Sequence, residues 1–264
     1  MADARGLLRD LLCLVGAAAM AWGYYVYARV LPTPALLAAW GIFSALIATA
    51  LVYRARIRRR AFLAVYVAPA SPLQHWLRGG VLLAVRPVLL GVLLALLLMV
   101  ALARISDHWT WLALIAAGPT LVLLRAWLAG RLAGHAGTLH LPILGWRAAA
   151  GVVGAGLVAL LVWLAFQQAY PDFTGVSLER AVWHMVDQEQ AHSDSGRVLL
   201  QAAAAKDGLR LWLAQQFMPA PATSLVQLFG WLLVLAEEVL FVWSYLLLSH
   251  GMLIGAGTVD RTGR

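Results

Sequence analysis

The stretch that decides the fold class is VLLAVRPVLLGVLLALLLMVALA, from Val81 to Ala103, which contains one charged residue, Arg86. About 20 consecutive apolar residues are needed to cross the hydrocarbon core of a bilayer as a helix. Lipid offers no hydrogen-bond partners to a loose backbone, so a segment of this kind crosses as an α-helix. The stretch therefore predicts a transmembrane helix.

Five more stretches of this kind lie on either side of it. They cover residues 11–31, 35–53, 109–128, 148–168 and 225–249. We therefore predict an all-α integral membrane bundle of six transmembrane helices. The first stretch imitates a secretory signal peptide, but it is longer than the apolar core of such a signal, so we expect the helix to be retained.

The composition excludes two other classes of protein. Of the 264 residues, 62% are hydrophobic and 12% are charged, whereas a soluble domain is about 45–50% apolar and about 25% charged. A water-soluble globule does not fit these values, and a disordered chain does not either, because disorder needs few apolar residues. The single cysteine, Cys13, excludes an intrachain disulfide.

The net charge of +8 comes from 20 basic and 12 acidic residues. Most basic residues fall on one side of the predicted spans, and an excess of arginine and lysine marks the cytoplasmic side. We therefore predict a bacterial inner-membrane protein with both termini in the cytoplasm. Because orientation explains the basic charge, we expect no nucleic-acid partner. An arginine collar follows the second span and is expected to contact membrane lipid or a partner protein. The collar consists of Arg54, Arg56, Arg58, Arg59 and Arg60.

The chain divides into three predicted regions. Residues 1–168 hold five transmembrane helices and the basic cytoplasmic loops, residues 169–224 form a periplasmic segment, and residues 225–264 hold the sixth helix and a short cytoplasmic tail. In the periplasmic segment we predict an amphipathic helical hairpin. Ser177 is expected to cap its first helix, residues 191–196 to form the turn, and Arg197 to begin its second helix. The apolar stripe predicted for the second helix is Val198, Ala202, Ala205, Leu209, Trp212 and Leu213.

The paired carboxylates Glu237 and Glu238 lie inside the sixth apolar stretch. Counted at about 1.5 Å per residue from Leu225, they are expected near the middle of the bilayer. An acidic residue there costs about 2.5–3.5 kcal/mol, so intramembrane acids are functional candidates. No cation is evident at that depth, so we expect these carboxyl groups to stay neutral, which is the condition for a proton relay.

Other polar residues could join Glu237 and Glu238 in a small polar centre. Ser244 lies seven residues after Glu237, on the same side of the helix. Pro119 frees a backbone carbonyl in the fourth span, next to Thr120, and Ser44 offers a hydroxyl from the second span. The alternative is that the two glutamates fix helix packing or bind a neighbouring subunit.

Histidine and carboxylate residues crowd the periplasmic segment, which could indicate a metal site. Their spacing matches no specific zinc pattern, so we interpret them as a solvated polar surface and expect no metal or cofactor. They are His184, Asp187, Glu189, His192 and Asp194.

No phosphate-binding loop, nucleophile elbow, zinc-protease or C-x-x-C motif is present. The five residues Glu237–Phe241 resemble the start of the paired-glutamate motif of CAAX-type intramembrane proteases. That family continues with arginine where this chain has Val242, and it needs histidines on later membrane helices, whereas His250 alone follows here. We therefore carry no protease activity over.

Two functions remain open from the sequence. The first is a non-enzymatic subunit of a larger envelope assembly, such as a secretion, conjugative-transfer or transport complex. Its expected partners are other membrane proteins or further copies of itself. The second is a proton-coupled transporter or channel subunit that uses Glu237 and Glu238.

Overall fold

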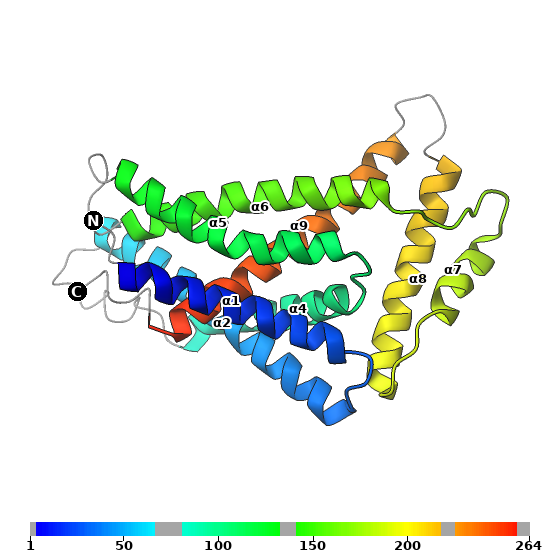
Figure 1. Ribbon diagram of the computed structural model, residues 1–264, viewed down its shortest axis with the longest axis horizontal. Coiled ribbons are helices and arrows are strands. Elements are labelled where there is room, and N and C mark those ends of the chain that lie inside the picture. The colour runs from blue at the N-terminus through cyan, green and yellow to red at the C-terminus, as the bar shows by residue number, and fades with distance from the viewer. Residues whose placement is uncertain (1–3, 67–80, 133–140, 218–224, 258–264) are drawn as a thin grey trace.

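A computed structural model describes residues 4–66, 81–132, 141–217 and 225–257 of the chain. In this part of the chain every regular element is a helix (Figure 1). In chain order the helices are α1 Ala4–Tyr27, α2 Thr33–Tyr66, α4 Val81–Ala103, α5 His108–Leu132, α6 Leu141–Gln167, α7 Leu178–Asp187, α8 Asp194–Phe217 and α9 Leu225–Gly255.

Six of these helices are long and apolar enough to cross a membrane, namely α1, α2, α4, α5, α6 and α9. This confirms the predicted all-α bundle of six candidate spans. One boundary differs in an informative way, because α2 continues 13 residues past the predicted end of its span, to Tyr66. The arginine collar therefore lies on a helix rather than in a loop. Arginine and alanine are good helix formers, and no glycine or proline interrupts α2 after Gly41.

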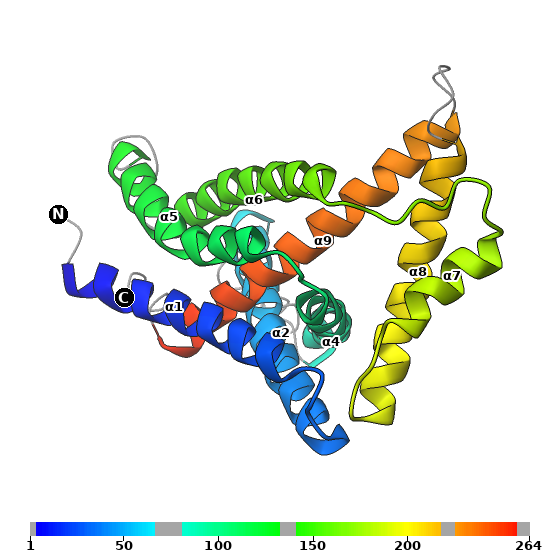
Figure 2. The same cartoon turned by 45° about the vertical axis from the view of Figure 1, so that its right-hand side comes forward.

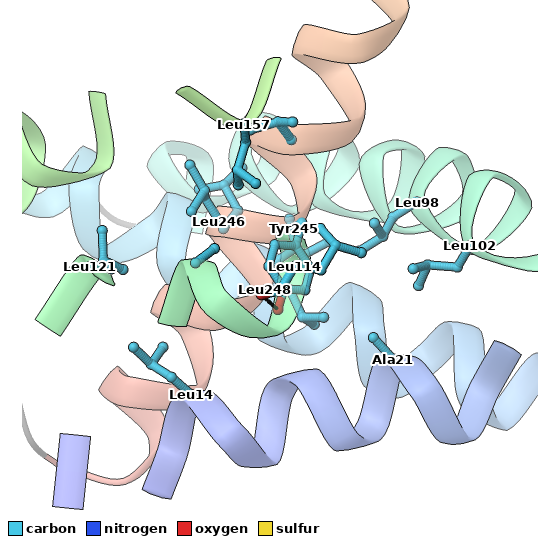
Figure 3. Close-up of a cluster of buried hydrophobic side chains, with 14 of the residues drawn as sticks. Leu14, Ala21, Leu98, Leu102, Leu114, Leu121, Leu157, Tyr245, Leu246 and Leu248 are labelled. Carbon is cyan, nitrogen blue, oxygen red and sulfur yellow. Dashed lines mark hydrogen bonds between the residues drawn. The ribbon is translucent and has the colours of Figure 1, made fainter. Parts of the chain in front are cut away.

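Helix α9 lies at the centre of the bundle and contacts α1, α2, α4 and α6. In its most apolar window 56% of the residues are buried, against 22–33% in the other candidate spans. Its side chains pack into a core of leucines supplied by the surrounding helices (Figure 3). At this level the Tyr245 hydroxyl donates a hydrogen bond to the backbone carbonyl of Leu114 on α5, at 2.9 Å. The bond satisfies a polar group that lipid could not.

Two glycines bring α2 very close to its neighbours. A Cβ atom on Gly91 of α4 would lie 2.9 Å from the backbone of Ala48, and a Cβ atom on Gly251 of α9 would overlap the carbonyl oxygen of Leu46. Small residues allow such backbone contact between membrane helices, where dispersion rather than the hydrophobic effect stabilises packing. Both contacts therefore require glycine.

The bundle has two different ends. Helices α7 and α8 lie across one end, which we call the hairpin end (Figures 1 and 2). Helix α1 begins and α9 ends at the opposite end, where α2 also carries the collar, and we call it the arginine end.

The hairpin forms as predicted, but the buried face of its second helix, α8, is not the predicted one. Ser177 is the N-cap of α7, and its side chain accepts from the Arg180 amide at 3.5 Å. Helix α8 begins at Asp194, three residues before the predicted start, because the Ser193 hydroxyl accepts from the Gly196 amide and caps it.

The apolar stripe predicted for α8 is not its buried face. Val198 is 62% exposed and Leu209 is 41% exposed, whereas Leu200, Ala204 and Gly208 are buried. Gly208 explains the difference, because a Cβ atom there would lie 3.0 Å from the Ala181 carbonyl oxygen of α7. Helix α8 thus turns its small residues toward α7 and leaves several large apolar side chains exposed.

Candidate functional site

A cluster of charged residues joins the hairpin to the bundle, and we call it the clamp. Its members are Arg29, Arg104, Glu189, Lys206, Asp207, Arg210 and Glu237. At its centre, Arg104 at the end of α4 pairs with Glu189 at 3.0 Å and with Asp207 of α8 at 2.9 Å. These three side chains are each at most 17% exposed. Close, partly buried pairs of this kind are stronger than surface pairs, which are worth about 0–1 kcal/mol.

Hydrogen bonds to the backbone fix the same contact. The His192 amide donates to the Arg29 carbonyl at 2.8 Å, and Arg104 also donates to the Leu200 carbonyl at 3.3 Å. The hydroxyls of Thr33 and Ser195 lie 3.2 Å apart. The hairpin is therefore held to the ends of α1, α2 and α4.

The loop before α7 is held by side chains of α8. Gln215 accepts from the Phe173 amide and donates to the Pro171 carbonyl, and Trp212 donates to the Val176 carbonyl at 2.8 Å. In this loop, hydrogen bonds from Thr174 lower the pKa of Asp172. Partial burial raises the pKa of the Tyr170 hydroxyl, although nearby Arg210 opposes that shift.

Glu237 belongs to the clamp, and this corrects two expectations. It pairs with Lys206, the one lysine of the chain, and with Arg210 at 2.8 Å, so it does not lack a cation. It also lies near the hairpin end rather than at mid-bundle. Tyr245 marks the level of Leu114, and Glu237 precedes Tyr245 by about 12 Å of helix, whereas α5 begins only about 9 Å before Leu114.

Glu238 and Ser244 do not join this cluster through direct bonds. Glu238 is half-buried and forms no hydrogen bond or ion pair within the described residues. Ser244 is fully buried and donates to the carbonyl of Leu240 on its own helix at 2.7 Å. Such a bond satisfies the hydroxyl locally, so Ser244 acts in helix packing rather than in a shared polar site.

The polar centre expected around the glutamates is not assembled. Thr120 is exposed and donates to the Ala116 carbonyl of its own helix at 2.8 Å. Pro119 and Thr120 lie about 8–9 Å beyond Leu114 toward the arginine end, which is the direction opposite to Glu237. Ser44 is buried on α2, and its hydroxyl has no hydrogen-bond partner among the described residues. Pro119 and Thr120 therefore sit at a depth different from that of Glu237.

The histidines and carboxylates of the hairpin are also dispersed. Among the described residues, no three metal-binding side chains gather into a group. Glu189 faces the bundle and pairs with Arg104, while His184 hydrogen-bonds Gln188 at 3.0 Å and Asp194 pairs with Arg197 at 2.6 Å. Asp187 and His192 are both exposed.

A second cluster lies at the arginine end, around a cavity of about 340 Å³ that we call the arginine pocket. Four arginines line it: Arg54 and Arg58 of α2, Arg125 of α5 and Arg147 of α6. The collar is thus divided. Arg54, which is half-buried, and Arg58, which is exposed, line the pocket. Arg56 and Arg60 are exposed and do not line it, and Arg59 is half-buried.

Aromatic rings form part of the wall of the pocket. His250 of α9 is 4% exposed and stacks on Trp146 of α6, with ring centroids 4.3 Å apart and planes at 20°. Tyr53 meets the same imidazole edge-on at 6.0 Å. Trp243 and Leu246 add an apolar surface from α9.

Within the described ranges of the chain, three buried nitrogen atoms at this wall have no hydrogen-bond partner: Arg54 Nε, Trp146 Nε1 and His250 Nδ1. A buried polar group without a partner costs about 1–3 kcal/mol, so most are satisfied in folded proteins. Three such atoms therefore lie at one cavity, and those of Arg54 and Trp146 are hydrogen-bond donors.

Sequence reasoning missed most of both clusters. A count of basic charge on each side of the membrane places Arg29, Arg104, Lys206 and Arg210 on the less basic side and gives them no partners. The signal that could have found the cluster is the supply of acids on that side, since Glu189, Asp207 and Glu237 are available to pair with these residues. His250 and Trp146 come together only through the packing of α6 on α9.

Comparison of the chain with protein-family models, with curated proteins and with solved structures finds no match.

Proposed function

We propose that the protein is a non-enzymatic, multi-pass subunit of a larger assembly in the bacterial inner membrane, and that its periplasmic hairpin is the docking element for a partner protein. The supporting observation is the clamp. It fixes α7 and α8 across the end of the bundle through charged groups that face inward.

The outer surface of the hairpin suits such a role. Trp183 is 55% exposed and Val198 is 62% exposed, and Leu178, Leu209 and Leu213 are also exposed. Exposed tryptophan and aliphatic side chains are typical of protein interaction sites, particularly at rigid positions where little conformational entropy is lost on binding. A clamped hairpin supplies that rigidity.

Site-specific photo-crosslinking in cells tests the proposal. A crosslinkable residue at position 198 should give discrete protein adducts, whereas one at the exposed polar position 184 on α7 should not. Adducts to lipid alone at position 198 would mean that the hairpin lies on the membrane, and would contradict the docking proposal.

The clamp provides an independent test. Arg104→Ala should reduce recovery of the crosslinked partner, because Glu189 and Asp207 lose their shared cation. Arg180→Ala is the matched control, since Arg180 is exposed on α7 and belongs to no ion pair in the described residues. Equal recovery from both variants would show that partner binding does not depend on how the clamp positions the hairpin.

A proton-coupled transporter or channel subunit is the second candidate, and Glu238 is the observation that favours it. This carboxyl is half-buried and has no direct partner in the described part of the chain, whereas Glu237 is occupied by two cations. Proton-dependent flux in proteoliposomes that is lost in Glu238→Gln would support this candidate. Flux that is unchanged in both Glu237→Gln and Glu238→Gln would remove it.

A further inference from the structure

The charge balance of the arginine pocket is unusual for a site at the end of a membrane bundle. Arg125 is neutralised by Asp10 of α1, at 3.0 Å. Arg54, Arg58 and Arg147 form no ion pair within the described residues, although they line the same cavity. Like charges brought this close repel one another, and an anion between them would relieve the repulsion.

The donors point to the chemistry of that anion. Guanidinium groups form paired, charge-assisted hydrogen bonds to phosphate oxygens, which is why arginine predominates where phosphate is recognised. The Nε–H of Arg54 and the indole N–H of Trp146 are buried at the cavity without an acceptor, and the buried Nδ1 of His250 is likewise unpartnered. Phosphate oxygens could accept from the Arg54 and Trp146 N–H groups, and also from His250 in the tautomer that carries its proton on Nδ1.

The position of the pocket adds a second constraint. Its polar residues lie in the last turns of the candidate spans of α2, α5 and α9 and in the first turns of that of α6. The pocket is also lined by apolar residues, which include Ala150, Trp243 and Leu246. A lipid whose headgroup lies at the membrane surface and whose chains enter the bilayer meets both surfaces.

We propose that the arginine pocket binds a phosphate group carrying more than one negative charge, such as a phosphomonoester or a diphosphate. Three uncompensated arginines favour such a group over a phosphodiester, which carries a single charge. The phosphate belongs either to a membrane lipid or to a free ligand, and the binding chemistry is the same. The site is independent of the docking role of the hairpin, because it lies at the other end of the bundle (Figure 1).

Retention of defined lipids by the full-length protein tests the proposal. The protein is exchanged into nanodiscs of phosphatidylcholine that contain a small fraction of either phosphatidic acid or phosphatidylglycerol, and bound lipid is measured by native mass spectrometry. We expect phosphatidic acid to be retained at least about tenfold better than phosphatidylglycerol. Equal retention of the two lipids and of phosphatidylcholine, together with no stabilisation by inorganic phosphate or pyrophosphate, would overturn the proposal.

Matched variants locate the site. Arg54→Gln with Arg147→Gln should abolish the preference for phosphatidic acid. Arg56→Gln should preserve it, because Arg56 lies on the same helix but is exposed and does not line the pocket. An equal loss in Arg56→Gln would show that the preference comes from the general charge of the collar, and would also overturn the proposal.

Thermal unfolding shows whether the double variant loses its preference for phosphatidic acid only because it is misfolded. Without added anion the double variant should unfold at the same temperature as the wild type or higher, because charge repulsion is removed. If it does not fold, Trp146→Phe is the substitute, since it deletes one unpartnered donor and keeps an aromatic ring. That variant should weaken retention of phosphatidic acid by a smaller factor, of about threefold, and unchanged retention would count against the site.

Inorganic phosphate and pyrophosphate in neutral detergent distinguish the two sources. Stabilisation of the wild type by these ions, beyond that produced by chloride at equal ionic strength, would assign recognition to the phosphate group alone. Retention of phosphatidic acid without such stabilisation would assign it to the lipid. Both results support the pocket, whereas a failure of both overturns it.

Discussion

The two ends of the bundle use the same residue type, arginine, in opposite ways. At the hairpin end Arg29, Arg104 and Arg210 meet carboxylates supplied by the hairpin and by α9. At the arginine end four arginines surround a cavity, and Asp10 is the one acidic partner that the described residues bring to them. Where acids are supplied, arginine stabilises a contact between elements, and where they are not, it leaves a positive site.

The largest effect is expected from a substitution that disrupts the clamp at the hairpin end. Arg104→Ala removes the cation that Glu189 and Asp207 share and leaves them only the longer contacts to Arg29, at 3.4 Å, and to Lys206, at 3.3 Å. Removing one partner of a buried pair costs about 3 kcal/mol, so the variant should unfold at a lower temperature and expose the hairpin to protease. Arg180→Ala is the control and should behave as the wild type. A wild-type protease pattern in Arg104→Ala would show that the clamp does not hold the hairpin.

The next effect tests how close helix packing stabilises the arginine end. Gly251→Ala places a methyl group against the carbonyl oxygen of Leu46 and should destabilise the bundle by about 2 kcal/mol through overpacking. Gly255→Ala on the same helix has open space and should change little. Denaturant unfolding in detergent measures both, and equal stability of the two variants would contradict the close contact of α2 and α9.

A smaller effect distinguishes the two neighbouring glutamates. Glu237→Gln removes the charge that binds Lys206 and Arg210, and because these groups are partly exposed we expect a loss of about 1 kcal/mol. Glu238→Gln removes no ion pair in the described residues and should not destabilise the protein. Unfolding at low and high salt checks the comparison, since salt should lessen the difference between the variants. The opposite order would place the important carboxyl at Glu238.

Much of the fold follows from the sequence, because each span is a local property. A run such as Val81–Ala103 is apolar along its whole length, and Ser177 caps its helix through contacts within three residues. The depth of Glu237 is different. It depends on Lys206 and Arg210, which lie 31 and 27 residues away on a helix whose buried face the sequence assigned wrongly.

The candidate sites were less predictable for a related reason. The arginine pocket forms where residues of α2, α5, α6 and α9 come together, and no local sequence pattern predicts those contacts. The collar was visible as a run of charge, but the run does not show that Arg54 turns inward while Arg56 stays exposed. Buried donors such as Trp146 Nε1 are recognisable only once their surroundings are known.

The smallest expected effect concerns the loop that leads into α7. Hydrogen bonds from Thr174 lower the pKa of Asp172, so they stabilise the loop at pH values above the usual range for this carboxyl and lose that contribution as pH falls through the lowered value. Thr174→Val should move the pKa of Asp172 back toward the usual range. An NMR titration of the carboxyl measures the shift, and an unchanged pKa would mean that the side-chain hydrogen bond is not formed.

Helix α9 gives the two ends a mechanical relation. It spans 31 residues without interruption, and its Gly251 presses on α2 at one end while Glu237 holds the hairpin about 21 Å away. If α9 moved as one rigid helix, its close contact with α2 at Gly251 would be the pivot. A tilt of about 10° there would swing Glu237 by nearly 4 Å, which is enough to separate it from Arg210. A change at the arginine end that tilted α9 would therefore weaken the contact between Glu237 and the hairpin at the other end of the bundle.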